Sequence, residues 1–149
     1  MSLELALRVT NRNMIVFDLA LGTATLLAPA ATLRTVFGHD EPSEDAVHLF
    51  RRCAPIWLTF AAAHAVAARR GAGRDWWALA WLRGTEIATD ALLAESPAIR
   101  RPGAKLGLRL AGLANLAMAA GFAWLSGRAA LPRDRQVPRH SVSRPPSPR

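Results

Sequence analysis

The chain has very few of the residues that build covalent or metal-based sites. Cys53 is the single cysteine among 149 residues. One cysteine excludes an intrachain disulfide, a CxxC redox pair and a cysteine-rich zinc site. At the start of an apolar block it is typical of a small packing residue. The sequence also shows no catalytic, metal-binding or cofactor-binding motif, so we expect no cofactor and no metal.

Lysine is almost absent as well. Lys105 is the only lysine, so arginine supplies nearly all the positive charge behind the formal net charge of +8. The isoelectric point is about 11.6, a value that often indicates nucleic-acid binding. Here the basic residues lie between apolar blocks and near the C-terminus, where membrane proteins carry cytoplasmic anchors. No aromatic residues are interleaved with them, and we expect no nucleic-acid partner.

The apolar residues gather in four blocks. Hydrophobic residues make up 51% of the chain, and the blocks cover residues 14–32, 53–68, 76–94 and 106–126. At about 1.5 Å per residue, each block is close to the length that crosses a bilayer. The sequence therefore predicts an all-α fold: a four-transmembrane-helix bundle over residues 1–127, in the cell (plasma) membrane. Residues 128–149, rich in Arg, Pro and Ser, are predicted to form a disordered basic tail.

Other interpretations of the blocks stay open. The first block could be a cleaved secretory signal peptide, although Asp18 interrupts its core and Pro29 lies at the expected cleavage site. The third block contains Arg83, Glu86 and Asp90, each costly in lipid, and could be a helix shielded by the other three. A soluble four-helix bundle is a further alternative, because the blocks are rich in alanine and only moderately hydrophobic.

The distribution of arginine predicts an orientation. Arg8 and Arg12 precede the first block, residues 69–74 carry arginines between the second and third, and the basic tail follows the fourth. The positive-inside rule places all of these on the cytoplasmic side, together with both termini. The basic stretch of residues 100–105 would then lie on the opposite side, which does not agree with the rule.

Six polar residues lie inside the predicted spans, where burying them has a cost that must be offset. They are Asp18, His64, Arg83, Glu86, Asp90 and Asn115. The three on the third block are spaced by three and four residues, so they share one helix face. We expect the six to form a polar seam or ligand-binding site through the centre of the bundle, with Asp90 within reach of Arg51 or Arg52.

This seam has a structural and a functional interpretation. In the structural one, Arg83 is neutralised by Asp18 or Glu86 and the network holds the bundle together. In the functional one, Glu86, Asp90 and His64 are candidate catalytic residues, because carboxylates and histidine can pass protons to and from a substrate.

Two stretches carry a family resemblance. They are LAPAATLRTVFGHDEP (residues 27–42) and LFRRCAPIWLTFAAAHAVAARR (residues 49–70). The Leu-Ala-Pro end of the first block, the Phe37-Gly38 turn and the arginine-led second block resemble the DoxX-like group of small four-helix membrane proteins, over residues 14–126. The resemblance implies the four-span architecture. Some members of the group are associated with respiratory-chain or sulfur-oxidising assemblies, but the group has no catalytic pattern to place on residues here.

Three functions follow as hypotheses. The first is a non-enzymatic accessory subunit that packs against a membrane-protein partner or a second copy, or that binds a small apolar, lipid-like ligand. The second is a membrane-embedded isomerase or cyclase-type enzyme, with Glu86 or Asp90 as acid or base and His64 as proton relay. It requires an apolar cavity bordered by these groups. The third is a small proton-coupled exporter that uses Asp18.

Overall fold

The computed structural model describes residues 1–130, which form six helices and no strand. The helices are α1 (Leu3–Leu27), α2 (Pro29–Thr35), α3 (Glu44–Arg52), α4 (Ala54–Arg70), α5 (Gly73–Ala94) and α6 (Pro102–Ala130). The all-α prediction is confirmed. Residues 128–130, predicted to begin the disordered tail, belong to α6, and the remainder of that tail lies outside the described residues.

Helix α1 begins well before the first predicted span. The Ser2 side chain accepts a hydrogen bond of 3.3 Å from the backbone N–H of Leu5 and so caps the helix. The polar lead-in to the span is therefore helical. The helix ends at Leu27 because Pro29 disfavours the helical conformation at Ala28, whose φ is −137°. Pro29 then starts α2.

Helices α3 and α4 follow each other with one residue between them. The Ser43 hydroxyl accepts a 3.2 Å hydrogen bond from the N–H of Ala46 and caps α3. Cys53 separates α3 from α4, which has Pro55 in its first turn. Gly71 ends α4 in the left-handed conformation, with φ 63°. The second predicted span, residues 53–68, is thus almost entirely α4.

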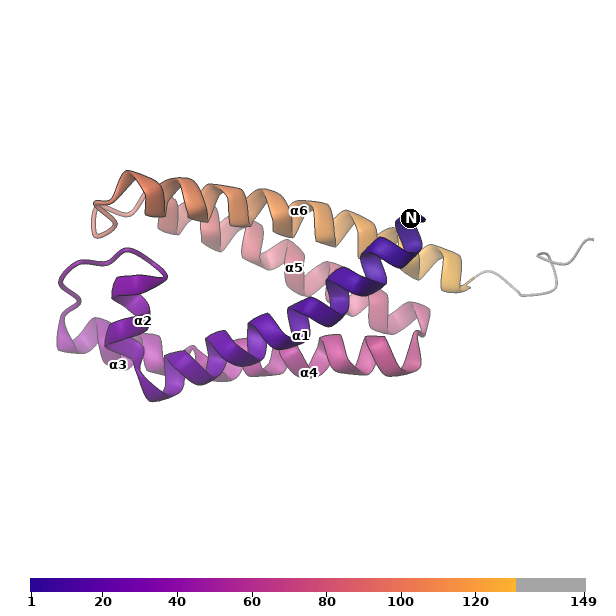
Figure 1. The fold of residues 1–149 in the computed structure, drawn as a ribbon, viewed down its shortest axis with the longest axis horizontal. Coiled ribbons are helices and arrows are strands. Elements are labelled where there is room, and N and C mark those ends of the chain that lie inside the picture. Colours follow the sequence, from indigo (N-terminus) through magenta and orange to yellow (C-terminus); the bar gives the residue numbers. More distant parts are fainter. Residues whose placement is uncertain (131–149) are drawn as a thin grey trace, which may run out of the picture.

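The long helices are arranged as two pairs (Figure 1). Helix α1 packs against α4 and helix α5 against α6, and α4 also contacts α5. The pairs converge at the end that holds the N-terminus, the α4–α5 turn and the end of α6, and they diverge toward α2 and α3 (Figure 1). At the diverging end, Arg101 forms a 2.9 Å ion pair with Asp40, and His39 forms an isolated bridge with Ile99. Loops therefore connect the pairs there.

Two apolar clusters lie at the ends of the bundle. The one at the converging end comprises Leu7, Ala67, Trp76, Leu79, Ala80, Phe122 and Leu125. The one at the diverging end is smaller and comprises Ala94, Ile99 and Leu108. On α5, the buried Arg83 lies between Ala80 of the first cluster and Ala94 of the second. The middle of the bundle is therefore the polar part of the interior.

The surface is apolar where the interior is polar. Large apolar side chains are exposed on every long helix, among them Val16, Phe17, Leu19, Ile56, Trp81, Leu92, Leu110, Leu113 and Leu116. Proteins that dissolve in water rarely expose such wide apolar faces. Within the described part, one helix, α6, is long and apolar enough to cross a membrane.

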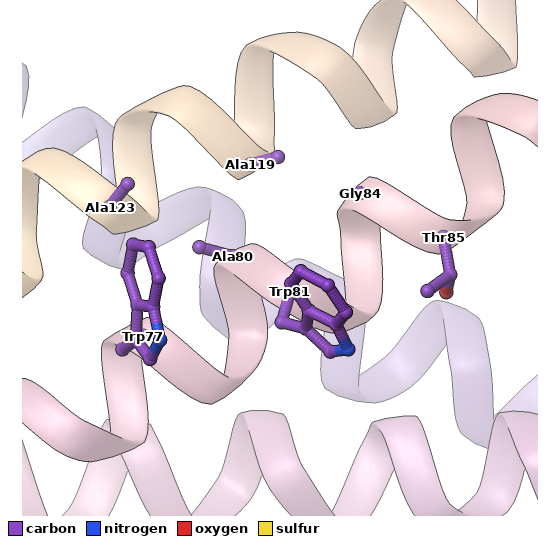
Figure 2. Close-up of a pocket in the computed structure, with 7 residues that line it drawn as sticks. All are labelled: Trp77, Ala80, Trp81, Gly84, Thr85, Ala119 and Ala123. Carbon is purple, nitrogen blue, oxygen red and sulfur yellow. The ribbon is translucent and has the colours of Figure 1, made fainter.

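The outer face of the α5/α6 pair carries a groove of about 360 Å³ (Figure 2). It is lined by Trp77, Ala80, Trp81, Gly84 and Thr85 of α5 and by Ala119 and Ala123 of α6. Trp77 and Trp81 are 58% and 70% exposed. The small residues let the two helices approach each other, so two indole rings and a few methyl groups make up most of the surface of this α5/α6 groove.

Candidate functional site

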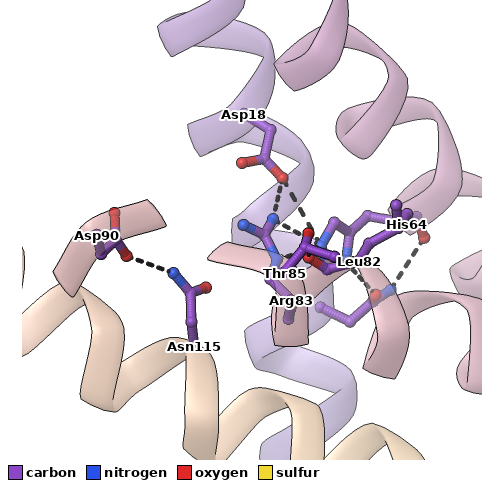
Figure 3. Close-up of polar contacts among 8 residues, drawn as sticks. Asp18, His64, Leu82, Arg83, Thr85, Asp90 and Asn115 are labelled. Carbon is purple, nitrogen blue, oxygen red and sulfur yellow. Dashed lines mark hydrogen bonds and ion pairs between the residues drawn. The ribbon is translucent and has the colours of Figure 1, made fainter. Parts of the chain in front are cut away.

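Four polar side chains meet in the middle of the bundle and form what we call the polar cluster: Asn11 and Asp18 of α1, His64 of α4 and Arg83 of α5. Figure 3 shows Asp18, His64 and Arg83 pointing toward one another. Each is at most 3% exposed. Three of the six residues predicted for the seam are thus brought together by three helices. The cluster joins the α1/α4 pair to α5, which belongs to the other pair.

The centre of the cluster is an ion pair. Arg83 Nη2 of α5 donates to Asp18 Oδ2 of α1. The guanidinium also lies over the ring of Phe60, with its carbon 5.2 Å from the ring centre, a favourable cation–π geometry. The positive charge is therefore balanced by one carboxylate and one aromatic face. This is the structural interpretation of the seam, with Asp18 rather than Glu86 as the partner.

The neighbours of His64 fix its tautomer. Arg83 Nε and Nη2 lie 3.1 and 2.7 Å from His64 Nε2. A guanidinium only donates hydrogen bonds, so Nε2 must be the accepting nitrogen and the ring proton resides on Nδ1. Nδ1 lies 2.6 Å from Asn11 Oδ1, to which it donates. The Asn11 side-chain amide in turn donates to the backbone carbonyl of His64 at 3.0 Å.

This geometry leaves His64 poorly suited to a proton relay. Its accepting lone pair is already engaged by Arg83, and a second proton would place two positive charges side by side. The ring also packs edge-to-face on Phe122, with centroids 5.7 Å apart. Asp18 Oδ1, although buried, has no hydrogen-bond partner among the described residues. The cluster is charge-compensated and closed to solvent, which suits structural support rather than turnover.

Asp90 and Asn115 form a separate polar contact. Asn115 Nδ2 of α6 donates to Asp90 Oδ2 of α5 at 2.9 Å (Figure 3). Gly112 of α6 faces the same part of α5, since a methyl group added there would be in ordinary van der Waals contact with the Asp90 Cβ, at 3.6 Å. Asp90 bonds to Asn115 rather than to Arg51 or Arg52. The predicted seam is thus divided into two groups.

Glu86 belongs to neither group. It is half-buried on α5, and within the described part of the chain its carboxylate makes no hydrogen bond or ion pair. The α5/α6 groove is lined by none of the three candidate catalytic residues, Glu86, Asp90 and His64. No group of three potential metal ligands occurs among residues 1–130. The described cavity therefore lacks the acid–base border that the enzyme hypothesis requires.

Asn11 was not predicted as a site residue, because it lies in the polar lead-in before the first block. The sequence did contain a signal for it. Asn11, Asp18 and Thr25 of α1 follow one another at seven-residue spacing, and all three are buried. Seven residues are close to two helical turns, so such a series lies on one helix face. The face of α1 that points inward is therefore polar.

An exposed ion pair links α5 to α6 at the diverging end. Arg109 Nη2 lies 2.7 Å from Glu95 Oε1, and both side chains are largely exposed. The hydrogen bond from Arg109, together with its positive charge, lowers the pKa of Glu95 below the ordinary value of a glutamate. The positive charge of Arg109 is thus locally balanced, as is that of Arg101 by Asp40.

Comparisons with protein-family models, with curated proteins and with solved structures found no match to this chain.

Proposed function

We propose that this chain is an integral membrane protein with four spans, in the manner of the DoxX-like group, and that it serves as a non-enzymatic accessory subunit with a surface for a lipid-like ligand. The observation that carries the proposal is the inverted distribution of side chains. Polar residues are buried in the middle of the bundle, while leucine, valine and tryptophan side chains are exposed on its outside. Such an arrangement is favourable in lipid, where apolar side chains face the hydrocarbon and polar side chains pair with one another inside.

The positions of the charges support the same conclusion. In α1, Asp18 is the single charged residue between Arg12 and the helix end, and it is fully buried. α4 has no formally charged residue before Arg69, and α6 has none between Arg109 and Arg128. Exposed charge is therefore confined to the ends of these three helices, which leaves the middle of each with an apolar outer face.

The distribution of charge between the two ends of the bundle supports the proposed orientation, with both termini in the cytoplasm. The converging end carries a surplus of arginine over carboxylate, from Arg8, Arg12, Arg69, Arg70, Arg74 and Arg128. At the diverging end, Arg101 and Arg109 are paired with Asp40 and Glu95. The basic stretch of residues 100–105, which did not agree with the positive-inside rule, is thus partly neutralised by the acidic loop.

The polar cluster and the α5/α6 groove both support the accessory role. The polar cluster is closed and joins helices, and the α5/α6 groove is an apolar surface without a reactive group. No observation favours the isomerase or the exporter over this role.

Membrane extraction and cysteine labelling test the proposal. The full chain should remain in the membrane pellet after alkaline carbonate treatment. In a Cys53→Ser background, Ser43→Cys should react with a membrane-impermeant maleimide on intact cells. Ser2→Cys should react only after permeabilisation, because Ser2 and Ser43 are exposed at opposite ends of the bundle. Release by carbonate would refute the membrane assignment, and labelling of both sites on intact cells would refute the topology.

A further inference from the structure

We propose that the α5/α6 groove is a binding site for one acyl chain of an anionic phospholipid whose phosphate is held by Arg74 and Arg128. The inference rests on the proposed membrane location and names the ligand class for that surface. It is carried by the combination of an apolar groove and unbalanced positive charge at one end of it.

The groove has the chemistry of an acyl-chain site. Its lining runs along α5 from Trp77 to Thr85, about 12 Å at 1.5 Å per residue. Thr85 is the only lining residue with a side-chain hydroxyl, and that hydroxyl already donates to the carbonyl of Leu82 at 2.7 Å. Trp77 extends toward Ala123 across the groove, and Trp81 lies one turn further along α5 (Figure 2). Apart from the indole N–H groups of Trp77 and Trp81, the lining offers a flexible hydrocarbon chain an apolar surface.

The converging end of the groove is positively charged. Arg74 lies one turn before Trp77 on α5, and its side chain is 76% exposed. Its nearest carboxylate, Asp75, is 3.9 Å away and is shared with Arg70 at 3.5 Å. Two arginines thus share one carboxylate, which leaves a net positive charge at this end of α5.

Arg128 adds to this charge from α6. Its guanidinium lies 4.9 Å from the ring centre of Trp124, which follows the groove residue Ala123 in the sequence. The two helices are close together here, since a Cβ at Gly73 would lie 3.0 Å from the Ser126 carbonyl oxygen. Arg74 and Arg128 therefore lie at the same end of the α5/α6 pair. Arginine is well suited to bind phosphate, and tryptophan to lie at the interface.

A second copy of the chain fits this groove less well. An α-helix with its side chains is about 10 Å wide, so 12 Å of helix fills more than twice the volume of the groove. A copy related by two-fold symmetry would also bring Arg74 and Arg128 toward their own counterparts. An acyl chain with an anionic headgroup meets neither obstacle, and the cytoplasmic leaflet is rich in such lipids.

Lipid titration followed by native mass spectrometry tests the proposal on the full-length chain in mild detergent. The wild type should bind one phosphatidylglycerol more tightly than one phosphatidylcholine. Gly84→Leu places a side chain in the groove, where a Cβ has open space, and should abolish the binding of both lipids. Ala119→Leu should do the same from α6. Gly107→Leu, a helical glycine with equally open space outside the groove, is the control and should bind as the wild type does.

Separate variants test the proposed contact of the lipid phosphate with Arg74 and Arg128. Arg74→Gln and Arg128→Gln should each weaken phosphatidylglycerol binding about fivefold and leave phosphatidylcholine binding unchanged. Arg69→Gln, an exposed arginine of α4 at the same end, should have no effect. The proposal is overturned if both filling variants still bind phosphatidylglycerol, if the arginine variants keep the preference, or if the groove variants instead break a dimer. The lipid titrations use protein that stays in the membrane after carbonate treatment. A negative lipid result would therefore refute the groove proposal and not the membrane assignment.

Discussion

Replacing Asp18 by asparagine should destabilise the protein more than any other single loss of a carboxylate. The side chain keeps its shape, but the guanidinium of Arg83 loses the one anion that contacts it within the described part. Arg83 is 3% exposed and cannot turn to water without moving α5. Breaking a buried ion pair by removing one partner typically costs about 3–5 kcal/mol. We expect Asp18→Asn to fall in that range.

A double-mutant cycle measures this coupling. The free energies of unfolding of Asp18→Asn, Arg83→Met and the double variant would be determined in mixed micelles by titration with sodium dodecyl sulfate, followed by tryptophan fluorescence. The double variant should be less destabilised than the sum of the single variants by about 1–3 kcal/mol, since no charge remains buried alone. As a control, Glu4→Gln removes an exposed ion pair to Arg8 and should cost at most about 1 kcal/mol. Additive single effects, or an Asp18→Asn cost no larger than the control, would refute the reasoning.

Three further predictions concern single contacts. Asn11→Leu removes the acceptor of the His64 Nδ1 proton and a donor to the His64 carbonyl, and should cost about 1–3 kcal/mol in the same unfolding assay; an unchanged midpoint would contradict this. Gly38→Ala should lower the thermal midpoint of unfolding, because Gly38 has φ +69° and a Cβ there would lie 2.3 Å from that of Ala104. Because Arg109 lowers the pKa of Glu95, their ion pair contributes stability at neutral pH that is lost as pH falls through this lowered pKa. Arg109→Gln should move the Glu95 titration, followed by carboxyl carbon NMR, to higher pH, and an unmoved titration would show that the pair does not form.

The helices and the buried polar residues of the spans follow from local patterns in the sequence. Pro29, Ser43 and Gly71 mark helix boundaries through backbone restrictions and capping that depend only on near neighbours. The cost of burying an arginine likewise predicts that Arg83 has a carboxylate partner. The sequence did not determine which carboxylate is that partner. Asp18 on another helix and Glu86 on the same face of α5 could each neutralise Arg83.

The position of Asn11 shows where local patterns fall short. Its surroundings, Thr10-Asn11-Arg12-Asn13, are typical of an interfacial segment, and hydropathy places it outside the first block. It is buried because α1 continues through this segment and α4 packs beside it, which brings the His64 backbone carbonyl within 3.0 Å. That contact spans 53 residues of sequence. The seven-residue spacing to Asp18 was visible, but its importance depends on which face of α1 meets α4.

The two helix pairs help to explain why a charged pair lies in the middle of an apolar molecule. Between helices surrounded by lipid, burial of apolar surface gives little preference for one register over another, since lipid tails are equally apolar. A buried arginine, by contrast, is tolerated only where its carboxylate is within reach. We infer that the contact of Asp18 with Arg83 fixes the position of α5 relative to the α1/α4 pair. His64 strengthens this role as a neutral acceptor held by Asn11, because a charged imidazole would repel the guanidinium that it now supports.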